Sequence, residues 1–148
     1  MIALGADHGG YNLKEAIIVY LKENNIEYTD YGCYSEESVD YAVYAKKVAE
    51  AVASGKADKG ILCCGTGIGI SIAANKVKGI RAAVVTNEFC AEMTRRHNDA
   101  NILAMGGRVI DAQTAVKLAD IFLNTEFEGG RHQRRIDQIT KIENGEEL

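Results

Sequence analysis

Five short apolar runs alternate with longer amphipathic segments along this chain, and that alternation restricts the folds it can adopt. The apolar runs predict strands over 2–6, 26–30, 60–64, 81–85 and 101–105. The segments between them predict helices over 12–24, 40–55, 67–78, 88–97 and 111–124. Strands that alternate with helices favour a parallel sheet with helices on both faces. We therefore expect an α/β protein with three α/β/α layers and a mostly parallel, five-stranded sheet.

The helical segments carry the periodicity and end signals of amphipathic helices. Apolar residues of the first one recur at i, i+3, i+4, i+7 and i+8, at Leu13, Ala16, Ile17, Tyr20 and Leu21. Gly55 is a suitable residue just beyond the second helix. Asp111 is a suitable N-cap for the fifth helix. These residues support the predicted end of the second helix and the predicted start of the fifth.

Length and composition favour one soluble globular domain over residues 1–148. Hydrophobic residues make up 47% of the chain and charged residues 26%. The net charge of −4 and the lack of a long basic run argue against a nucleic-acid partner. No apolar run approaches a membrane span, and we expect no signal peptide. The four cysteines lack zinc-site spacing, which predicts reduced thiols in a cytoplasmic protein.

The C-terminal tail, residues 131–148, follows a glycine pair and predicts a charged helix. Its apolar residues, Ile136, Ile139 and Ile142, recur at three-residue spacing. Such a narrow stripe can pack against a partner subunit or against its own domain. The pattern alone leaves both open.

Candidate site residues fall on strand ends or near them, in the loops where open α/β sheets bind ligands. The first strand leads to Asp7 and His8, and the third to Cys64 and "GTGIG". The helix after the fourth strand closes with His97 and Asn98, and the fifth strand leads to Arg108. We expect these groups to form one site.

The glycine-rich loop at 65–69 can cradle an anion, because glycine backbone N–H groups turn freely toward a ligand before a helix N-terminus. A tight turn without a ligand is the alternative. Cys64 directly precedes this loop, where a thiolate can act as a base. The alternative role for Cys64 is that of a small, buried hydrophobic residue. We assign this role to Cys33, Cys63 and Cys90. Strand alternation sends Cys63 to the opposite face from Cys64.

The remaining candidates have alternative roles as well. His97 can be a helix-end or surface residue, and Asp7 can be an N-cap. Arg131 and Arg135 share a helix face and can hold one phosphate, or they can form a solvated face. Together the residues predict a small α/β enzyme with a compact, phosphorylated ligand and thiol-plus-imidazole proton transfer.

The chain resembles the B-type ribose-5-phosphate isomerases, which are grouped with the galactose-6-phosphate isomerase subunits. The likeness extends over "GADHGGYNLKE", "VDYAVYAKKVAEAV", "CGTGIGISIAANKVKGIRAA", "RRHNDANILAMGGRVI" and "EGGRHQRRI". It implies a Rossmann-like fold with a C-terminal dimerisation helix. It also implies interconversion of ribose 5-phosphate and ribulose 5-phosphate in the pentose phosphate pathway, through a cis-enediol(ate), without metal or cofactor.

The resemblance further implies individual roles. Cys64 carries a proton between C1 and C2, and His97 opens the furanose ring with help from Asp7. The turn Gly65, Thr66, Gly67, Ile68 and Gly69 holds the enediolate oxygen, and Asn98 adds a hydrogen bond. His8 and Arg108 contact substrate or phosphate. Arg131 and Arg135 reach the phosphate of the neighbouring subunit, which implies a homodimer that can pair into a tetramer.

Two departures qualify these roles. Some members of the family use a carboxylate base after the glycine loop, whereas this chain has Asn75 and Lys76 there, which supports Cys64. Ala42 stands where the family often has proline, which bears on fine specificity. An isomerase of six-carbon sugars or their phosphates, and a non-catalytic sugar-phosphate sensor, are the competing readings. A sensor needs neither Cys64 nor His97.

Overall fold

All five strands are parallel, and they lie side by side across the sheet in the order β2-β1-β3-β5-β4. The computed structural model describes residues 1–148. The strands are β1 (Ile2–Ala6), β2 (Tyr28–Asp30), β3 (Lys59–Cys64), β4 (Ala82–Val84) and β5 (Ile102–Gly106). The helices are α1 (Tyr11–Glu23), α2 (Tyr41–Ala53), α3 (Ile68–Ala74), α4 (Glu88–Asn98), α5 (Ala112–Asn124) and α6 (Arg131–Glu143). The three-layer prediction is confirmed, and the sheet is fully rather than mostly parallel.

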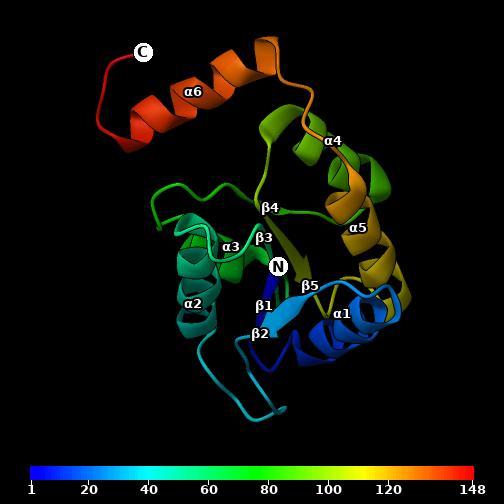
Figure 1. The fold of residues 1–148 in the computed structure, drawn as a ribbon. Coiled ribbons are helices and arrows are strands. Elements are labelled where there is room, and N and C mark those ends of the chain that lie inside the picture. Colours follow the sequence, from blue (N-terminus) through cyan, green and yellow to red (C-terminus); the bar gives the residue numbers. More distant parts are fainter.

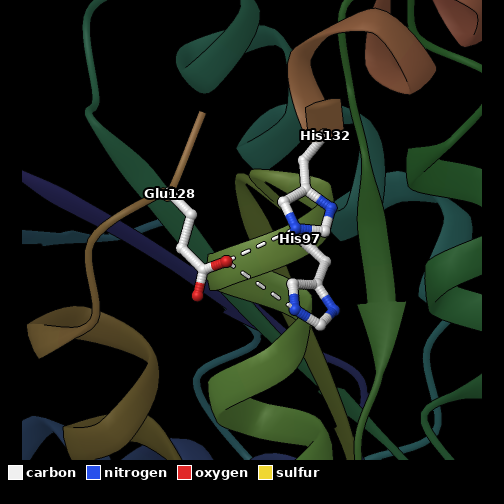
Figure 2. Close-up of side chains that lie close together, drawn as sticks. All are labelled: His97, Glu128 and His132. Atoms are coloured by element: carbon white, nitrogen blue, oxygen red, sulfur yellow. Dashed lines mark ion pairs between the residues drawn. The ribbon is translucent and has the colours of Figure 1, made fainter. Parts of the chain in front are cut away.

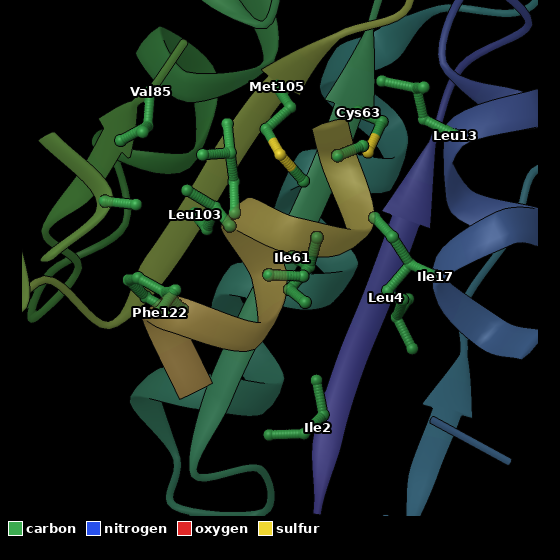
Figure 3. Close-up of a cluster of buried hydrophobic side chains, with 14 of the residues drawn as sticks. Ile2, Leu4, Leu13, Ile17, Ile61, Cys63, Val85, Leu103, Met105 and Phe122 are labelled. Carbon is green, nitrogen blue, oxygen red and sulfur yellow. The ribbon is translucent and has the colours of Figure 1, made fainter. Parts of the chain in front are cut away.

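Helices cover both faces of the sheet, and each face has its own apolar core (Figure 1). Leu13 and Ile17 of α1 pack with Phe122 of α5 against one face (Figure 3). Val48 of α2 and Ile70 of α3 pack against the other. Strand side chains alternate between these cores, so a residue's parity along its strand determines the core that it joins.

Most predicted boundaries lie within two residues of those observed, and α3 is the main exception. The helix was predicted over 67–78 but ends at Ala74. The Asn75 side chain pairs with the backbone of Ala82, accepting its N–H at 2.7 Å and donating to its carbonyl at 3.0 Å. These two hydrogen bonds anchor the chain to the start of β4 and compete with a further helical turn.

The cap predicted for α5 is confirmed. The Asp111 carboxylate accepts the Thr114 N–H at 2.8 Å. Hydrogen bonds with Thr114 lower the pKa of Asp111, because they stabilise the ionised form.

Helix α6 lies apart from the sheet, beyond the end of α4 (Figure 1). His132 and Ile136 are its buried residues, while Ile139 and Ile142 are exposed. Exposed apolar side chains on a helix are suited to packing against a partner subunit. The role of α6 in dimerisation stays a prediction. No helix in the structure combines the length and apolar character needed to cross a membrane.

Candidate active site

Three loops meet at the carboxyl ends of the central strands β1, β3 and β5. Gly107 N–H donates to the Cys64 carbonyl at 2.8 Å, and Arg108 N–H donates to the Gly65 carbonyl at 2.9 Å. Asp7 N–H donates to the Cys63 carbonyl at 3.1 Å. Backbone bonds of this kind fix the loops relative to one another. The candidate residues of these loops therefore share one rigid edge of the sheet.

Glycine makes this close approach of the loops possible. A Cβ on Gly10 would lie 2.2 Å from the Cys63 carbonyl carbon and oxygen. A Cβ on Gly107 would lie 2.2 Å from the Gly9 carbonyl oxygen. Backbone atoms cannot move aside as the end of a flexible side chain can. The glycines of these loops are therefore required for packing of the site.

Replacing Gly10 with alanine is expected to lower the free energy of unfolding by about 3 kcal/mol, because the β1 and β3 loops must separate. Gly5→Ala is the matched control, since its Cβ would meet a Val48 side-chain methyl group at 2.9 Å. Urea unfolding of both variants measures the difference. Equal losses would contradict the proposed backbone clash.

Cys64 ends β3 with its side chain turned toward the start of α3. It is 4% exposed, and its sulfur accepts the Gly67 N–H at 3.1 Å. Gly67 is the N-cap of α3, with a positive φ of 82°. The left-handed turn thus directs a backbone donor at the thiol. A substrate carbon placed against this sulfur would also lie beside the loop N–H groups.

Cys63 faces the opposite core, as strand alternation predicted. Burial raises the pKa of the Cys63 thiol, because the thiolate loses its hydration in the apolar interior. Cys33 is also buried, whereas Cys90 on α4 is exposed.

Iodoacetamide at neutral pH is expected to modify Cys90 first and to leave Cys63 unmodified in the folded protein, because the reagent needs an accessible thiolate. Peptide mass spectrometry over a time course measures the order. Modification of Cys63 before Cys90 would contradict the assigned burial. A sample unfolded in urea, in which all four thiols react, is the control.

Asp7 and His8 are both engaged by backbone groups. The Asp7 carboxylate accepts the N–H groups of Gly9 at 2.8 Å and Gly10 at 3.2 Å. It therefore caps the turn before α1 rather than the helix itself. His8 Nδ1 accepts the Val39 N–H at 3.2 Å, which leaves Nε2 to carry the proton of the neutral ring. That nitrogen is free to donate to a ligand.

Two further polar side chains lie against the glycine-rich loop, one from just after β5 and one from the start of α2. The Arg108 guanidinium lies beside Gly65, with Nη1 3.3 Å from where a Cβ would stand. Tyr41 packs over Gly69, with ring atom Cζ 2.8 Å from the corresponding position. The sequence reasoning did not select Tyr41. The tyrosine next to Ala42 in "DYA" was the available signal.

His97 and Asn98 do not lie at this edge, contrary to expectation. Helix α4 runs back across the sheet, so its last turn reaches the amino ends of the strands. The Asn98 carbonyl accepts Arg81 Nε at 3.0 Å, and Arg81 stands just before β4. Cys64 is at the far end of the six-residue strand β3, roughly 16 Å along the sheet. Within a single chain, the His97 imidazole therefore lies far from the Cys64 thiol.

Arg131 and Arg135 belong to the same end of the molecule as His97. Both are exposed on α6, which packs beside α4. The predicted site residues thus form two groups. The thiol group at the carboxyl ends of the strands contains Asp7, His8, Cys64, the turn Gly65 to Gly69 and Arg108. The imidazole group at α4 and α6 contains His97, Asn98, Arg131 and Arg135.

Two residues that sequence reasoning missed accompany His97. The His97 and His132 rings stack with centroids 4.3 Å apart and an angle of 14° between planes. Glu128 Oε1 lies 3.3 Å from His132 Nε2 and 4.0 Å from His97 Nε2 (Figure 2). These ligand atoms all lie within 4.8 Å of one another. Parallel rings point their lone pairs side by side rather than at one ion, so this arrangement does not form a tetrahedral metal site.

Comparisons with known proteins agree with this architecture. Residues 2–139 match the model of the Ribose/Galactose Isomerase family. The ribose-5-phosphate isomerase B of Escherichia coli is 51% identical over 142 residues, which are 96% of this chain and 95% of that protein.

Solved structures are similarly close. The ribose-5-phosphate isomerase B of Clostridium thermocellum is 56% identical, with a TM-score of 0.96 over 97% of each chain. The enzyme of Mycoplasma genitalium, solved with bound ribulose-5-phosphate, is 42% identical, with a TM-score of 0.92 over 97% of this chain and 95% of the other. Sequence and fold agree over nearly the whole length, and the chain therefore belongs to the Ribose/Galactose Isomerase family.

Proposed function

We propose that this chain is an aldose–ketose isomerase that interconverts D-ribose 5-phosphate and D-ribulose 5-phosphate through a cis-enediol(ate). The observation that carries the proposal is the Cys64 sulfur, which accepts the Gly67 N–H from within the glycine-rich turn. A base and several backbone N–H donors therefore lie next to one another. Family membership and the bound ribulose-5-phosphate of the Mycoplasma genitalium enzyme support the substrate.

The thiol group can perform the central proton transfer. Cys64 takes the C2 proton of the open aldehyde as a thiolate and returns it to C1, so no metal or cofactor is needed. Negative charge develops on the enediolate oxygen during this step. Backbone N–H groups of the turn from Gly65 to Gly69, with Thr66, would stabilise that charge where it forms, by about 3 kcal/mol for one good donor.

Ring opening and substrate binding draw on both groups of residues. His97 opens the furanose ring with assistance from Asp7, and Asn98 adds a hydrogen bond to the sugar. His8 and Arg108 hold the phosphate from one side, and Arg131 and Arg135 from the other. Phosphate contacts remote from the reacting carbons supply binding energy that orients the sugar.

A second copy of the chain brings the two groups together. Within one chain the sheet separates Cys64 from His97, whereas a homodimer can place the partner's His97, Asn98, Arg131 and Arg135 over the thiol group. The tail from 131 to 148 would make this contact. Exposed apolar side chains next to the glycine loop, Ile68 and Ile72 of α3, offer a surface for the exposed isoleucines of α6.

A ribose 5-phosphate isomerisation assay with EDTA present tests the proposal. Ribulose 5-phosphate formation at enzymatic rates is the expected result, and no turnover would overturn it. Galactose 6-phosphate and allose 6-phosphate are the comparison substrates. The family's description includes galactose isomerases, and one extra hydroxymethyl group changes transition-state binding only modestly, about 10- to 200-fold in rate.

A further inference from the structure

The segment between α5 and α6 returns the chain to the last turn of α4. Glu128 N–H donates to the Arg96 carbonyl at 3.1 Å, which ties this segment to α4. Gly129 and Gly130 then take positive φ values of 71° and 57°, which glycine adopts without strain. His132 N–H donates to the Gly129 carbonyl at 3.1 Å. This turn sets His132 directly against His97.

His132 is buried although it lies in a strongly polar helix. It is 7% exposed, whereas Arg131 and Gln133 beside it are exposed. Ile136 is the other buried residue of α6 and gives the helix an apolar contact with the rest of the chain. Burying an imidazole costs hydration, which an apolar side chain at this position would not lose. Packing alone would therefore favour an apolar residue at position 132.

The contacts of His132 restrict the His97 ring. Its own ring covers one face of His97 at 4.3 Å, and Glu128 Oε1 stands beside the Nε2 atoms of both rings (Figure 2). The other carboxylate oxygen, Oε2, lies 3.4 Å from Arg96 Nη1, which holds Glu128 in place. Rotation of the His97 ring would break the stack and turn Nε2 away from the carboxylate.

We propose that His132 and Glu128 are positioning residues that orient the His97 imidazole for opening the sugar ring. The inference rests on the proposed function, in which His97 performs that step. Residues behind a catalytic group set its direction, and small misplacements lower the rate of proton transfer strongly. The stack and the carboxylate together hold one ring orientation before the sugar arrives.

Ring opening can be separated from isomerisation by the choice of substrate. In opening, the O1 hydroxyl loses its proton, C1 becomes the aldehyde carbon, the bond from C1 to O4 breaks, and O4 takes up a proton. His97 carries that proton. Ribulose 5-phosphate is already an open chain, so exchange of its C1 proton with solvent needs the thiol group but not ring opening.

The test compares these two rates in a His132→Ala variant. Turnover of ribose 5-phosphate is expected to fall roughly 10- to 100-fold, while deuterium exchange at C1 of ribulose 5-phosphate in D₂O stays within about threefold of wild type. Proton NMR follows the exchange. A His132→Phe variant, which keeps an aromatic face against His97, is expected to recover most of the turnover.

Two controls separate positioning from structural support. Ile136→Ala removes the other anchor of α6 and should lower both rates, because it displaces Arg131 and Arg135 together with His132. Gln113→Ala, exposed on α5 outside both groups of site residues, should leave both rates unchanged. Circular dichroism confirms that each variant is folded.

Each outcome has one meaning. A selective loss of ribose 5-phosphate turnover in His132→Ala supports the inference. Equal losses in both rates, no loss in either, or failure of His132→Phe to recover turnover would overturn it. Wild-type protein with neither turnover nor exchange would instead refute the proposed function.

Discussion

Replacing Cys64 with alanine is expected to lower the rate of ribose 5-phosphate isomerisation at least ~100-fold, the scale of removing a general base. The thiol lies at the carboxyl end of β3 beside the glycine turn, and the Gly67 N–H is directed at its sulfur. Alanine occupies less space and cannot take up a proton. Steady-state kinetics in the presence of EDTA measure the loss.

Cys63→Ala is the matched control for this variant. It removes the neighbouring sulfur on the same strand, but from the core on the opposite face of the sheet. Its turnover is expected to stay close to wild type, with at most a small loss of stability from the core. Full activity in Cys64→Ala would move the base to another residue, and equal losses in both variants would indicate damage to β3 instead.

Mixing two inactive variants is expected to restore activity if each site draws on two chains. Cys64→Ala lacks the proposed base, and His97→Asn lacks the imidazole that we propose opens the ring. In a mixed dimer, the intact Cys64 of one chain would meet the intact His97 of the other in one of the two sites. Random pairing at equal amounts then gives about a quarter of wild-type activity, from less than about 1% in either variant alone.

Co-expression of the two variants gives the randomly paired dimers for this measurement, and two different affinity tags report the share of mixed dimers. The control pairs Cys64→Ala with a chain that carries both substitutions, since that dimer has no site with both groups. No recovery in the test mixture would mean that a single chain assembles its own site, against the separation of α4 from the carboxyl end of β3. Recovery in the control mixture would mean that the substitutions do not remove the chemistry.

Local patterns in the sequence predicted most elements of the fold. Apolar runs and helical spacing identified all five strands and the helices between them. Alternation along β3 assigned Cys63 and Cys64 to opposite faces. Asp111 was correctly recognised as the cap of α5. Each of these signals acts over a few residues, where backbone geometry determines side-chain direction.

Local patterns of this kind could not predict contacts between segments that are distant in the sequence. Lys14 is 1% exposed, and its Nζ lies 2.8 Å from both carboxylate oxygens of Asp30 on β2. A lysine on an amphipathic helix is ordinarily solvated, and only the position of β2 beside β1 gives it a buried partner. The end of α3 depended in the same way on the pairing of Asn75 with β4.

By itself the sequence determined the fold class, the thiol beside a glycine turn, and the small set of residues that we propose bind and convert a sugar phosphate. Those conclusions depend on spacing within short stretches of chain. Only the tertiary structure decided which stretches meet, because strand order and helix direction are not encoded in local periodicity. It placed Asp7, Cys64 and Arg108 at one edge of the sheet, and it carried His97 to the other with Glu128 and His132 beside it.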